Sequence, residues 1–224
     1  MPRSLEPRDL ECTSRLELSL LRRGVKLIAG TDEAGRGSLL GPLYAAAVIL
    51  DTARPIAGLN DSKKLSPQAR ACFAAEIQEK ALAYKVIAVS AQEVDKLNVF
   101  EATRQAMVRA LLALDPLPEF VLADAMPLAS GRKPGFSIPY WSIIHGDARS
   151  VSIAAASILA KVARDAHLDR LDRKYPQYCL ARNKGYGTRE HLEALARFGP
   201  CPEHRRTYQP VKDFLSPRLP FGPA

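Results

Sequence analysis

The chain has 224 residues, of which 47% are hydrophobic and 25% are charged, and its formal net charge is +8. This composition excludes a wholly disordered chain and suffices for one α/β domain with a modest extension. No apolar run approaches the roughly 20 residues of a membrane span, and the N-terminus lacks the apolar region of a secretory signal. We therefore expect a cytoplasmic protein that does not interact with membranes, and we predict a monomer.

The first predicted elements are a polar N-terminal extension and a β-hairpin. Residues 1–23 form the extension, with a short helix around LELSLLRR. Strands follow at 25–33 (VKLIAGTDE) and 41–50 (GPLYAAAVIL). The glycines and the proline between these two apolar runs are typical of a turn. Because so short a connection cannot hold a crossover helix, the two strands are predicted to pair antiparallel.

Helices and strands then alternate along the chain. Ser66 is a suitable N-cap and Pro67 suits the first helical position, so a helix is predicted over 67–82. The next predicted elements are a strand at 84–90, one long or two short helices over 91–114, a strand at 119–124, a loop over 127–141 and a short strand or strand end at 142–147. This order predicts an α/β fold, a mixed sheet flanked by helices.

The C-terminal third is predicted to be helical and basic. The alanine-rich segment 150–175 has the apolar spacing of a long helix, and a shorter helix runs from Thr188 to the Gly199-Pro200 stop. Between residues 148 and 212 there are 13 Lys and Arg against 6 Asp and Glu, a net charge of +7. The rest of the chain therefore has a net charge of only +1. Such a region suits either a polyanion-binding surface or a well-solvated helical face, and charge alone does not separate the two.

These patterns divide the chain into four predicted parts. They are the extension 1–23, a main domain 24–175, a basic helical subdomain 176–215 and a flexible tail 216–224. The four cysteines form no CxxC pair and the four histidines lack a ligand spacing, so a zinc site is not predicted.

Acidic side chains follow three of the apolar, strand-like segments. Asp32 and Glu33 end LIAGTDE, Asp124 ends FVLAD, and Asp147 ends SIIHGD. A single acid at such a place is commonly a turn former. Three such junctions in one sheet predict instead that the four carboxylates converge, because neighbouring strands lie about 4.8 Å apart.

A cluster of four carboxylates repels itself unless a cation lies among them. Oxygen ligands with few histidines suit Mg²⁺ or Mn²⁺ rather than zinc. Two such ions about 4 Å apart clamp the attacking and leaving oxygens of an in-line phosphoryl displacement. We therefore predict Asp32, Glu33, Asp124 and Asp147 as both the metal ligands and the catalytic residues.

Three further motifs are candidates for substrate contacts, although each also has an ordinary structural interpretation. Gly35-Arg36-Gly37 allows close backbone approach to a sugar and offers Arg36 to a phosphate, or it is simply a tight turn. Lys63 precedes a helix start that suits a phosphate, or it lies in a solvated cap. Lys184-Gly185-Tyr186-Gly187 offers a ring that stacks on a nucleotide, or Tyr186 covers the edge of the core.

Taken together, ordered motifs over roughly residues 25–212 resemble bacterial ribonuclease HII. The motifs are DEAGRG (32–37), DSKKLS (61–66), the AD of VLAD (123–124), HGD (145–147), AAASILAKVARD (154–165), NKGYGT (183–188) and HRRTYQPV (204–211). The resemblance implies a ribonuclease H-like sheet with a small helical C-terminal subdomain. It also implies a metal-dependent endonuclease that cuts RNA in RNA–DNA hybrids and incises beside single ribonucleotides in duplex DNA.

The resemblance also assigns roles to individual residues. The family's four acids correspond to Asp32, Glu33, Asp124 and Asp147, and its 2′-hydroxyl sensor to Gly35, Arg36 and Gly37, assisted by Tyr186. By the same mapping, Lys63, Lys161 and Lys184 contact phosphates.

This sequence departs from the family's usual pattern at three positions, Ala125, His145 and Asn183, where the family often has Gly, Lys and His. Two alternatives remain, a two-metal integrase or resolvase that needs no 2′-hydroxyl sensor and a basic nucleic-acid binder without catalysis.

Overall fold

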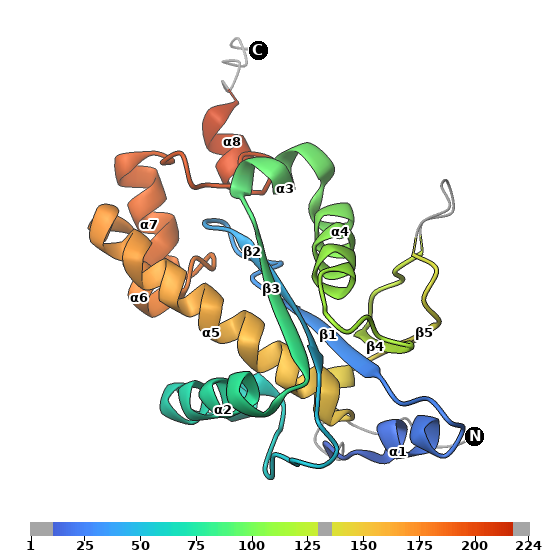
Figure 1. Cartoon of the computed structure of the whole chain (residues 1–224). Coiled ribbons are helices and arrows are strands. Elements are labelled where there is room, and N and C mark those ends of the chain that lie inside the picture. Colours follow the sequence, from blue (N-terminus) through green and yellow to red (C-terminus); the bar gives the residue numbers. More distant parts are fainter. Residues whose placement is uncertain (1–10, 130–135, 217–224) are drawn as a thin grey trace, which may run out of the picture.

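A mixed β-sheet lies at the centre of the chain in a computed structural model that describes residues 11–129 and 136–216 (Figure 1). Within these residues, the strands are β1 (Ile28–Ala34), β2 (Leu43–Ile49), β3 (Ala83–Val89), β4 (Phe120–Asp124) and β5 (Tyr140–Ile143). Their order is β3-β2-β1-β4-β5. The pairs β1–β2 and β2–β3 are antiparallel, whereas β1–β4 and β4–β5 are parallel.

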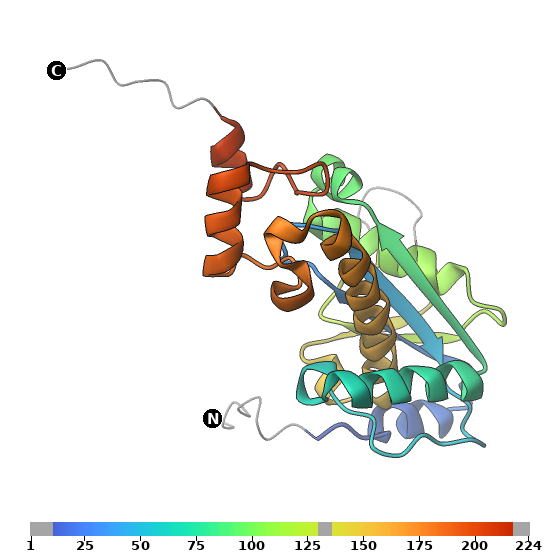
Figure 2. The ribbon, with the colours of Figure 1, turned by 90° about the vertical axis from the view of Figure 1, so that its left-hand side faces the viewer.

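Helices cover both faces of this sheet. The helices are α1 (Arg15–Leu21), α2 (Pro67–Lys80), α3 (Ala91–Leu97), α4 (Val99–Leu112), α5 (Val151–Lys174), α6 (Leu180–Asn183), α7 (Arg189–Phe198) and α8 (Val211–Leu215). Short 3₁₀ turns are η2 (Ser62–Lys64), η3 (Gly146–Ala148) and η4 (Pro176–Tyr178). Helices α5 and α2 pack on one face, and α3 and α4 pack on the other (Figures 1 and 2).

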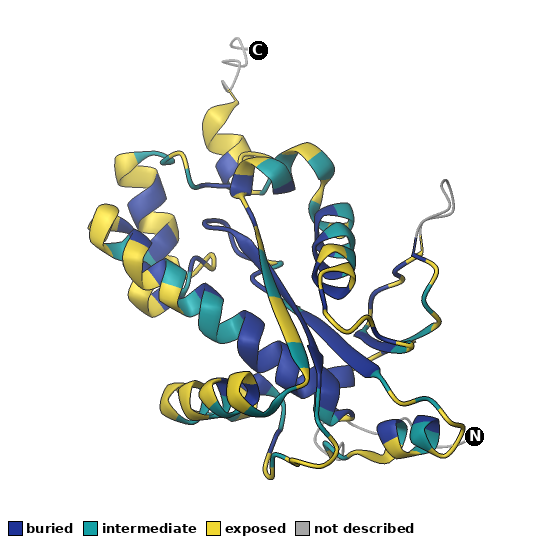
Figure 3. Cartoon of the chain, viewed as in Figure 1, coloured by how far each residue is buried: buried dark blue, intermediate teal, exposed yellow. Residues whose placement is uncertain are grey.

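The sheet brings α5 unusually close to β1. A Cβ on Gly30 of β1 would lie 2.1 Å from the carbonyl carbon of Ser152 in the first turn of α5. Only glycine allows backbone to approach this closely. The N-terminal half of α5 is consequently buried against the sheet, while its C-terminal half is more exposed (Figure 3). This packing holds the N-terminal half of α5 against β1, with Ser152 beside Gly30 and Ser157 beside Asp32.

The C-terminal helices pack against the far half of α5. Leu40, from the loop after β1, shares a buried cluster with Leu168 and Leu171 of α5 and with Tyr178 and Leu180. In Figure 2, α7 stands beside α5 on the side where the described chain ends. The loop between β1 and β2 is therefore enclosed by the C-terminal segment.

The predicted hairpin and helix starts are confirmed. β1 and β2 pair antiparallel, with Ala34 opposite Tyr44. Helix α2 begins at Pro67, where the Ser66 hydroxyl accepts a hydrogen bond from the Ala69 N–H (3.1 Å). Thr188 caps α7 in the same way. The α/β fold and the mixed sheet flanked by helices are as predicted.

The structure decides between the two alternatives for one element and corrects the bounds of another. The segment 91–114 forms two helices, because Asn98 at φ +67° interrupts the chain between α3 and α4. The short strand or strand end predicted over 142–147 is confirmed only at its start: β5 begins two residues earlier and ends at Ile143, and Asp147 lies in η3. His145 has a left-handed conformation (φ +55°), which turns the chain from β5 into η3.

The remaining predictions concern the chain ends and the membrane. The extension 1–23 is described only from residue 11; its helix α1 packs through Leu20 against Ile28 and Ile153. Nearly all of the predicted tail 216–224 lies outside the described residues. No helix in the described ranges is long and apolar enough to cross a membrane.

Candidate active site

Three of the four predicted carboxylates lie at the ends of the two central parallel strands. Asp32 and Glu33 are the fifth and sixth residues of β1, and Asp124 is the last residue of β4. The parallel register pairs Thr31 with Ala123, so that Asp32 and Asp124 follow at the next position of each strand. Parallel strands place their carboxyl ends at one edge of the sheet, which explains why acids about 90 residues apart meet.

The fourth acid, Asp147, reaches the cluster from η3 rather than from a strand. The Gly146 N–H donates to Asp124 Oδ1 (2.7 Å), which ties η3 to the end of β4. The Asp147 carboxylate is almost fully buried and accepts a hydrogen bond from Lys63 Nζ (3.0 Å). Lys63 thus supplies a positive charge to one side of the acidic cluster.

Burial and mutual repulsion both perturb this cluster. Burial raises the pKa of Asp32 well above its usual range, and the Glu33 and Asp124 charges raise it further. Burial, with the charge of Asp124, raises the pKa of Glu33 to about 7, although Arg36 opposes the shift. Burial also raises the pKa of Asp124, to which the Asp147 charge adds. Several buried acids with raised pKa values are typical of a functional site rather than a surface turn.

A pocket of about 380 Å³ opens over these acids. Its lining residues are Asp32, Glu33, Ala34, Gly35, Arg36, Gly37, Ser62, Lys63, Asp124, Ser157, Lys161 and Tyr186. Asp147 and Lys184 are the predicted site residues that do not line it. The pocket therefore joins three carboxylates, the Gly-Arg-Gly turn, two of the three predicted lysines and the predicted tyrosine.

The donor set of the acidic cluster fits a hard divalent cation. All four acids offer oxygen, and their repulsion is the electrostatic cost that a cation between them would remove. In the conformation of the described residues, no three acidic, His or Cys side chains are arranged closely enough to hold an ion. Asp147 is instead paired with Lys63, so a bound ion requires these side chains to reorient.

Glu33→Gln should stabilise the metal-free protein at high pH. A raised folded-state pKa means that ionisation of Glu33 opposes folding. This cost is absent below pH 4.5, grows between pH 4.5 and about 7, and is complete above that range. We expect the free energy of unfolding of the variant to be about 3 kcal/mol higher than that of the wild type at pH 8 in EDTA, with no gain at pH 4. Urea denaturation at both pH values measures the difference; equal stability at pH 8 would contradict the electrostatic account.

The Gly-Arg-Gly turn is held from behind by a buried arginine of the C-terminal segment. The Arg205 guanidinium is fully buried and donates to the carbonyls of Arg36 (2.8 Å) and Gly41 (3.2 and 3.1 Å). The Tyr208 hydroxyl also donates to the Arg36 carbonyl (2.9 Å). Within the described residues, no hydrogen bond uses the N–H groups of Arg36 or Gly37. The Arg36 carbonyl is thus occupied by hydrogen bonds that hold the turn in place, whereas the backbone N–H groups of Arg36 and Gly37 are available to a ligand.

A second buried arginine joins this turn to the Tyr186 loop. Arg164 of α5 donates to the Pro42 carbonyl (3.1 Å), the Lys184 carbonyl (3.0 Å) and the Ser38 hydroxyl (2.7 Å). Its guanidinium also lies 5.7 Å from the centre of the Tyr186 ring. Buried charges are costly unless every donor is satisfied, so such a residue fixes the segments that it touches. Arg164 therefore sets the distance between the two loops that flank the pocket.

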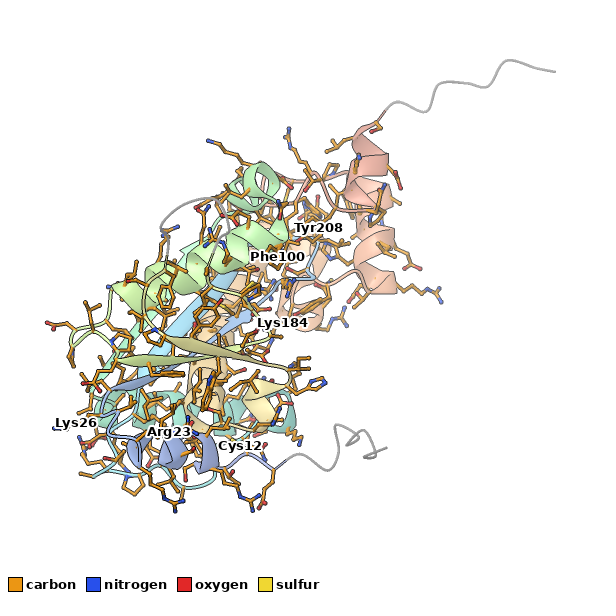
Figure 4. The ribbon with its side chains drawn as sticks, turned by 90° about the vertical axis from the view of Figure 1, so that its right-hand side faces the viewer. Cys12, Arg23, Lys26, Phe100, Lys184 and Tyr208 are labelled. Atoms are coloured by element: carbon orange, nitrogen blue, oxygen red, sulfur yellow. The ribbon has the colours of Figure 1, made fainter. Side chains whose placement is uncertain are left out.

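Each of the three predicted phosphate-binding lysines already has a carboxylate partner. Lys63 pairs with Asp147, Lys161 with Asp165 (2.7 Å) and Lys184 with Asp169 (2.7 Å). Figure 4 shows Lys184 on the side of the molecule toward the C-terminal helices, away from Arg23 and Lys26 beside α1. A phosphate must compete with these carboxylates for each ammonium group.

Sequence reasoning missed the two buried arginines and one serine. Arg164 and Arg205 lie inside the motifs that carry the family resemblance, but the sequence shows them only as positive charge. An arginine in the middle of an apolar, alanine-rich helix was the signal for burial. Ser157, whose hydroxyl bonds to that of Ser62 (3.0 Å) and contacts Asp32, gave no signal in the sequence.

Two of the departures from the family pattern have a local structural consequence. Ala125 adopts φ +41°, a conformation that favours glycine, which is the residue the family often has there. Asn183 donates to the Tyr178 carbonyl (2.6 Å) and accepts from the Gly185 N–H (2.8 Å), and it thereby shapes the start of the Tyr186 loop. The exposed His145 side chain lies near Asp124, and its charged form would oppose the raised pKa of that carboxyl.

Ala125→Gly is expected to stabilise the protein. Relief of the left-handed strain is partly offset by the larger entropy of glycine in the unfolded chain, which leaves a gain of about 0.5 kcal/mol. Chemical denaturation of both proteins at one pH measures the gain. A loss of stability would show that the Ala125 methyl group contributes packing that outweighs the strain.

The strand order, the helices on both faces and an acidic pocket at the carboxyl ends of β1 and β4 define a ribonuclease H-like fold. Among solved structures, ribonuclease H2 from Pyrococcus horikoshii OT3 is similar, with a TM-score of 0.71 and 27% identity over 84% of this chain and 97% of that one. Bst-RNase HIII in complex with Mn²⁺ shares the fold, with a TM-score of 0.63 and 18% identity over 96% of this chain and 73% of that one.

Sequence comparison gives the family. The ribonuclease HII family model matches residues 29–211. Ribonuclease HII of Geobacillus kaustophilus (strain HTA426) is 51% identical over 201 residues, which is 90% of this chain and 75% of that protein. The chain belongs to the ribonuclease HII family, and it is an endonuclease of the ribonuclease H type.

Proposed function

We propose that this enzyme hydrolyses RNA in RNA–DNA hybrids and incises on the 5′ side of single ribonucleotides in duplex DNA, leaving a 3′-hydroxyl and a 5′-phosphate. One observation carries the proposal: a single pocket joins Asp32, Glu33 and Asp124 to a turn with free backbone amides and to Tyr186. The acids suit phosphodiester hydrolysis, whereas the turn and the ring suit recognition of the adjacent sugar.

The Gly-Arg-Gly turn is proposed to recognise the ribose 2′-hydroxyl. This group alone distinguishes a ribonucleotide from a deoxyribonucleotide at a given sugar. Within the described residues the amides of Arg36 and Gly37 are unpaired, and a Cβ on Gly37 would meet nothing within 4 Å, so a sugar can approach the turn. The Arg36 side chain, paired with Glu33 at 3.8 Å, lies where it can meet the adjacent phosphate.

Tyr186 is proposed to contact the neighbouring sugar. Its side chain is 41% exposed, lines the pocket and follows Gly185, whose backbone contacts the loop after the turn. A ring placed against a sugar favours the slimmer deoxyribose on its own side of a junction. This preference would place the phosphate 5′ to the ribonucleotide over the carboxylates.

Asp32, Glu33, Asp124 and Asp147 are proposed to hold two Mg²⁺ or Mn²⁺ ions. When bound, such ions supply a Lewis acid to the scissile phosphate and lower the pKa of water. Asp32 is deeply buried and interacts electrostatically with the other three acids, so it would be the central ligand of such a site. Ser157, which contacts Asp32 from the first half of α5, orients that carboxylate.

Duplex binding is proposed to use the backbone phosphates, largely without regard to sequence. The surface charge is smaller than the sequence suggests, because Arg164 and Arg205 are fully buried. Lys63 and Lys161 line the pocket and are proposed to contact the phosphates next to the cleaved bond, whereas Lys184 lies outside the pocket.

A substrate comparison tests the proposed function. The full chain is incubated with Mg²⁺ or Mn²⁺ and either a DNA duplex containing one ribonucleotide or the same duplex made entirely of DNA. We expect one cut, 5′ to the ribonucleotide, and no cut in the all-DNA duplex. Equal cleavage of both would favour an integrase- or resolvase-like nuclease, and binding without cleavage would favour a non-catalytic role.

A further inference from the structure

Two buried histidines lie behind the Tyr186 loop and are not used by the proposed chemistry. His191 belongs to α7, and His204 lies in the segment that pairs with Leu40. Both side chains are almost completely buried, and their Nε2 atoms are 3.2 Å apart. Two imidazoles at this distance must share one proton along the line between them.

The hydrogen bonds at the outer nitrogens decide where the protons are. The Cys201 N–H donates to His204 Nδ1 (3.0 Å), so this nitrogen carries no proton. The proton of neutral His204 is therefore on Nε2 and is donated to His191 Nε2. His191 must then carry its own proton on Nδ1, which donates to the Tyr186 carbonyl (2.9 Å). All hydrogen bonds in this series run in one direction.

The surroundings keep both rings neutral. Burial lowers the pKa of His191, and burial together with the neighbouring His191 lowers the pKa of His204 to about 4. The ring of Tyr178 packs against both imidazoles, at 4.8 Å from His204 and 5.9 Å from His191 between ring centres. Within the described residues, no carboxylate forms an ion pair with either ring.

The two ends of this series of hydrogen bonds lie on the two segments that shape the proposed ribose site. One end holds the Tyr186 carbonyl, which also accepts from the Thr188 N–H (2.8 Å). The other end lies in the segment 201–205, in which Arg205 supports the Arg36 carbonyl. The histidines therefore connect the support of the Gly-Arg-Gly turn to the Tyr186 loop.

We propose that His191 and His204 are positioning residues: their one-way series of neutral hydrogen bonds fixes the Tyr186 loop relative to the turn that recognises the ribose. The inference rests on the proposed function of Tyr186. It assigns His204 as the Nε2–H tautomer and His191 as the Nδ1–H tautomer.

The assignment can be measured without substrate. Side-chain ¹⁵N NMR of the histidine-labelled full chain at pH 7 distinguishes protonated from unprotonated ring nitrogens. We expect opposite tautomers for the two residues, assigned by comparison with His191→Asn and His204→Asn. Identical tautomers, or a charged ring in either residue at pH 7, would overturn the proposal.

Kinetics test the positioning role. The side-chain amide introduced by His191→Asn can still donate to the Tyr186 carbonyl, whereas the methyl group introduced by His191→Ala cannot. We expect His191→Ala to raise KM for a one-ribonucleotide duplex about tenfold, and His191→Asn to recover most of that loss. His167→Asn serves as the control, because His167 bonds to the Tyr44 hydroxyl (2.8 Å) outside the series of histidine hydrogen bonds.

A Tyr186→Ala background separates positioning from general damage. If His191 acts through Tyr186, His191→Ala should change KM less than twofold in that background. An equal tenfold effect with and without Tyr186 would overturn the proposal. Failure of the wild type to cleave the duplex would instead refute the proposed function, and the tautomer measurement would still decide the assignment of the histidines.

Discussion

Asp32→Asn is expected to reduce cleavage of a one-ribonucleotide duplex by about a thousandfold or more, with duplex affinity retained. The side chain keeps its size but loses the charge at the centre of the acidic cluster, where it interacts with Glu33, Asp124 and Asp147. Removal of a negative charge near a polyanion does not weaken binding, so the loss should be confined to the rate.

Asp213→Asn is the matched control for this experiment. Asp213 is an exposed residue of α8 outside the acidic pocket, and the substitution makes the same change of charge. Single-turnover cleavage and fluorescence anisotropy of the two variants separate rate from affinity. Retained cleavage by Asp32→Asn would contradict the central role of this carboxylate.

Gly35→Ala is expected to have the second large effect, on both stability and activity. Gly35 adopts φ +89°, and a Cβ there would lie 1.9 Å from Nε of Arg164. That guanidinium cannot simply move away, because it is buried and bonded to Pro42, Ser38 and Lys184. We expect a loss of about 3 kcal/mol in unfolding free energy and a fall of roughly a hundredfold in kcat/KM.

Gly37→Ala is the matched control for stability. Gly37 lies in the same turn, but a Cβ there would meet nothing within 4 Å. Urea denaturation should place this variant within about 0.5 kcal/mol of the wild type. A Gly35→Ala protein as stable as Gly37→Ala would show that the contact between the turn and Arg164 does not constrain the site.

The acidic cluster was predictable because the sequence pattern marks the strand ends and the geometry of a sheet brings such ends together. Apolar runs that end in acid placed Asp32, Glu33 and Asp124 at strand ends, and the parallel pairing of β1 with β4 brings these ends together. Asp147 was located less well. Its approach depends on the left-handed turn at His145. Histidine is among the non-glycine residues enriched in that conformation, but so few of them adopt it that the sequence did not predict the turn.

The contacts that support the site could not be predicted from the sequence, although the position of Arg164 in an apolar helix is a signal for its burial. A count of charges treats every arginine as surface, whereas Arg164 and Arg205 are buried and hold backbone carbonyls. The same holds for the ion pair of Lys184, because its partner Asp169 lies 15 residues away in the chain, whereas the pair of Lys161 with Asp165 has the i,i+4 spacing that a helix brings together. Such long-range pairings arise from tertiary packing, because the packing determines which polar groups are buried and which partner each of them contacts.

Anomalous diffraction from crystals of the full chain, soaked in Mn²⁺ at a concentration that supports cleavage, tests the central claim most directly. We expect manganese between Asp32 and Asp124 beside the Gly-Arg-Gly turn, with Lys63 Nζ no longer bonded to Asp147. An active protein whose pocket shows no manganese, and whose Lys63–Asp147 pair remains intact, would contradict the account.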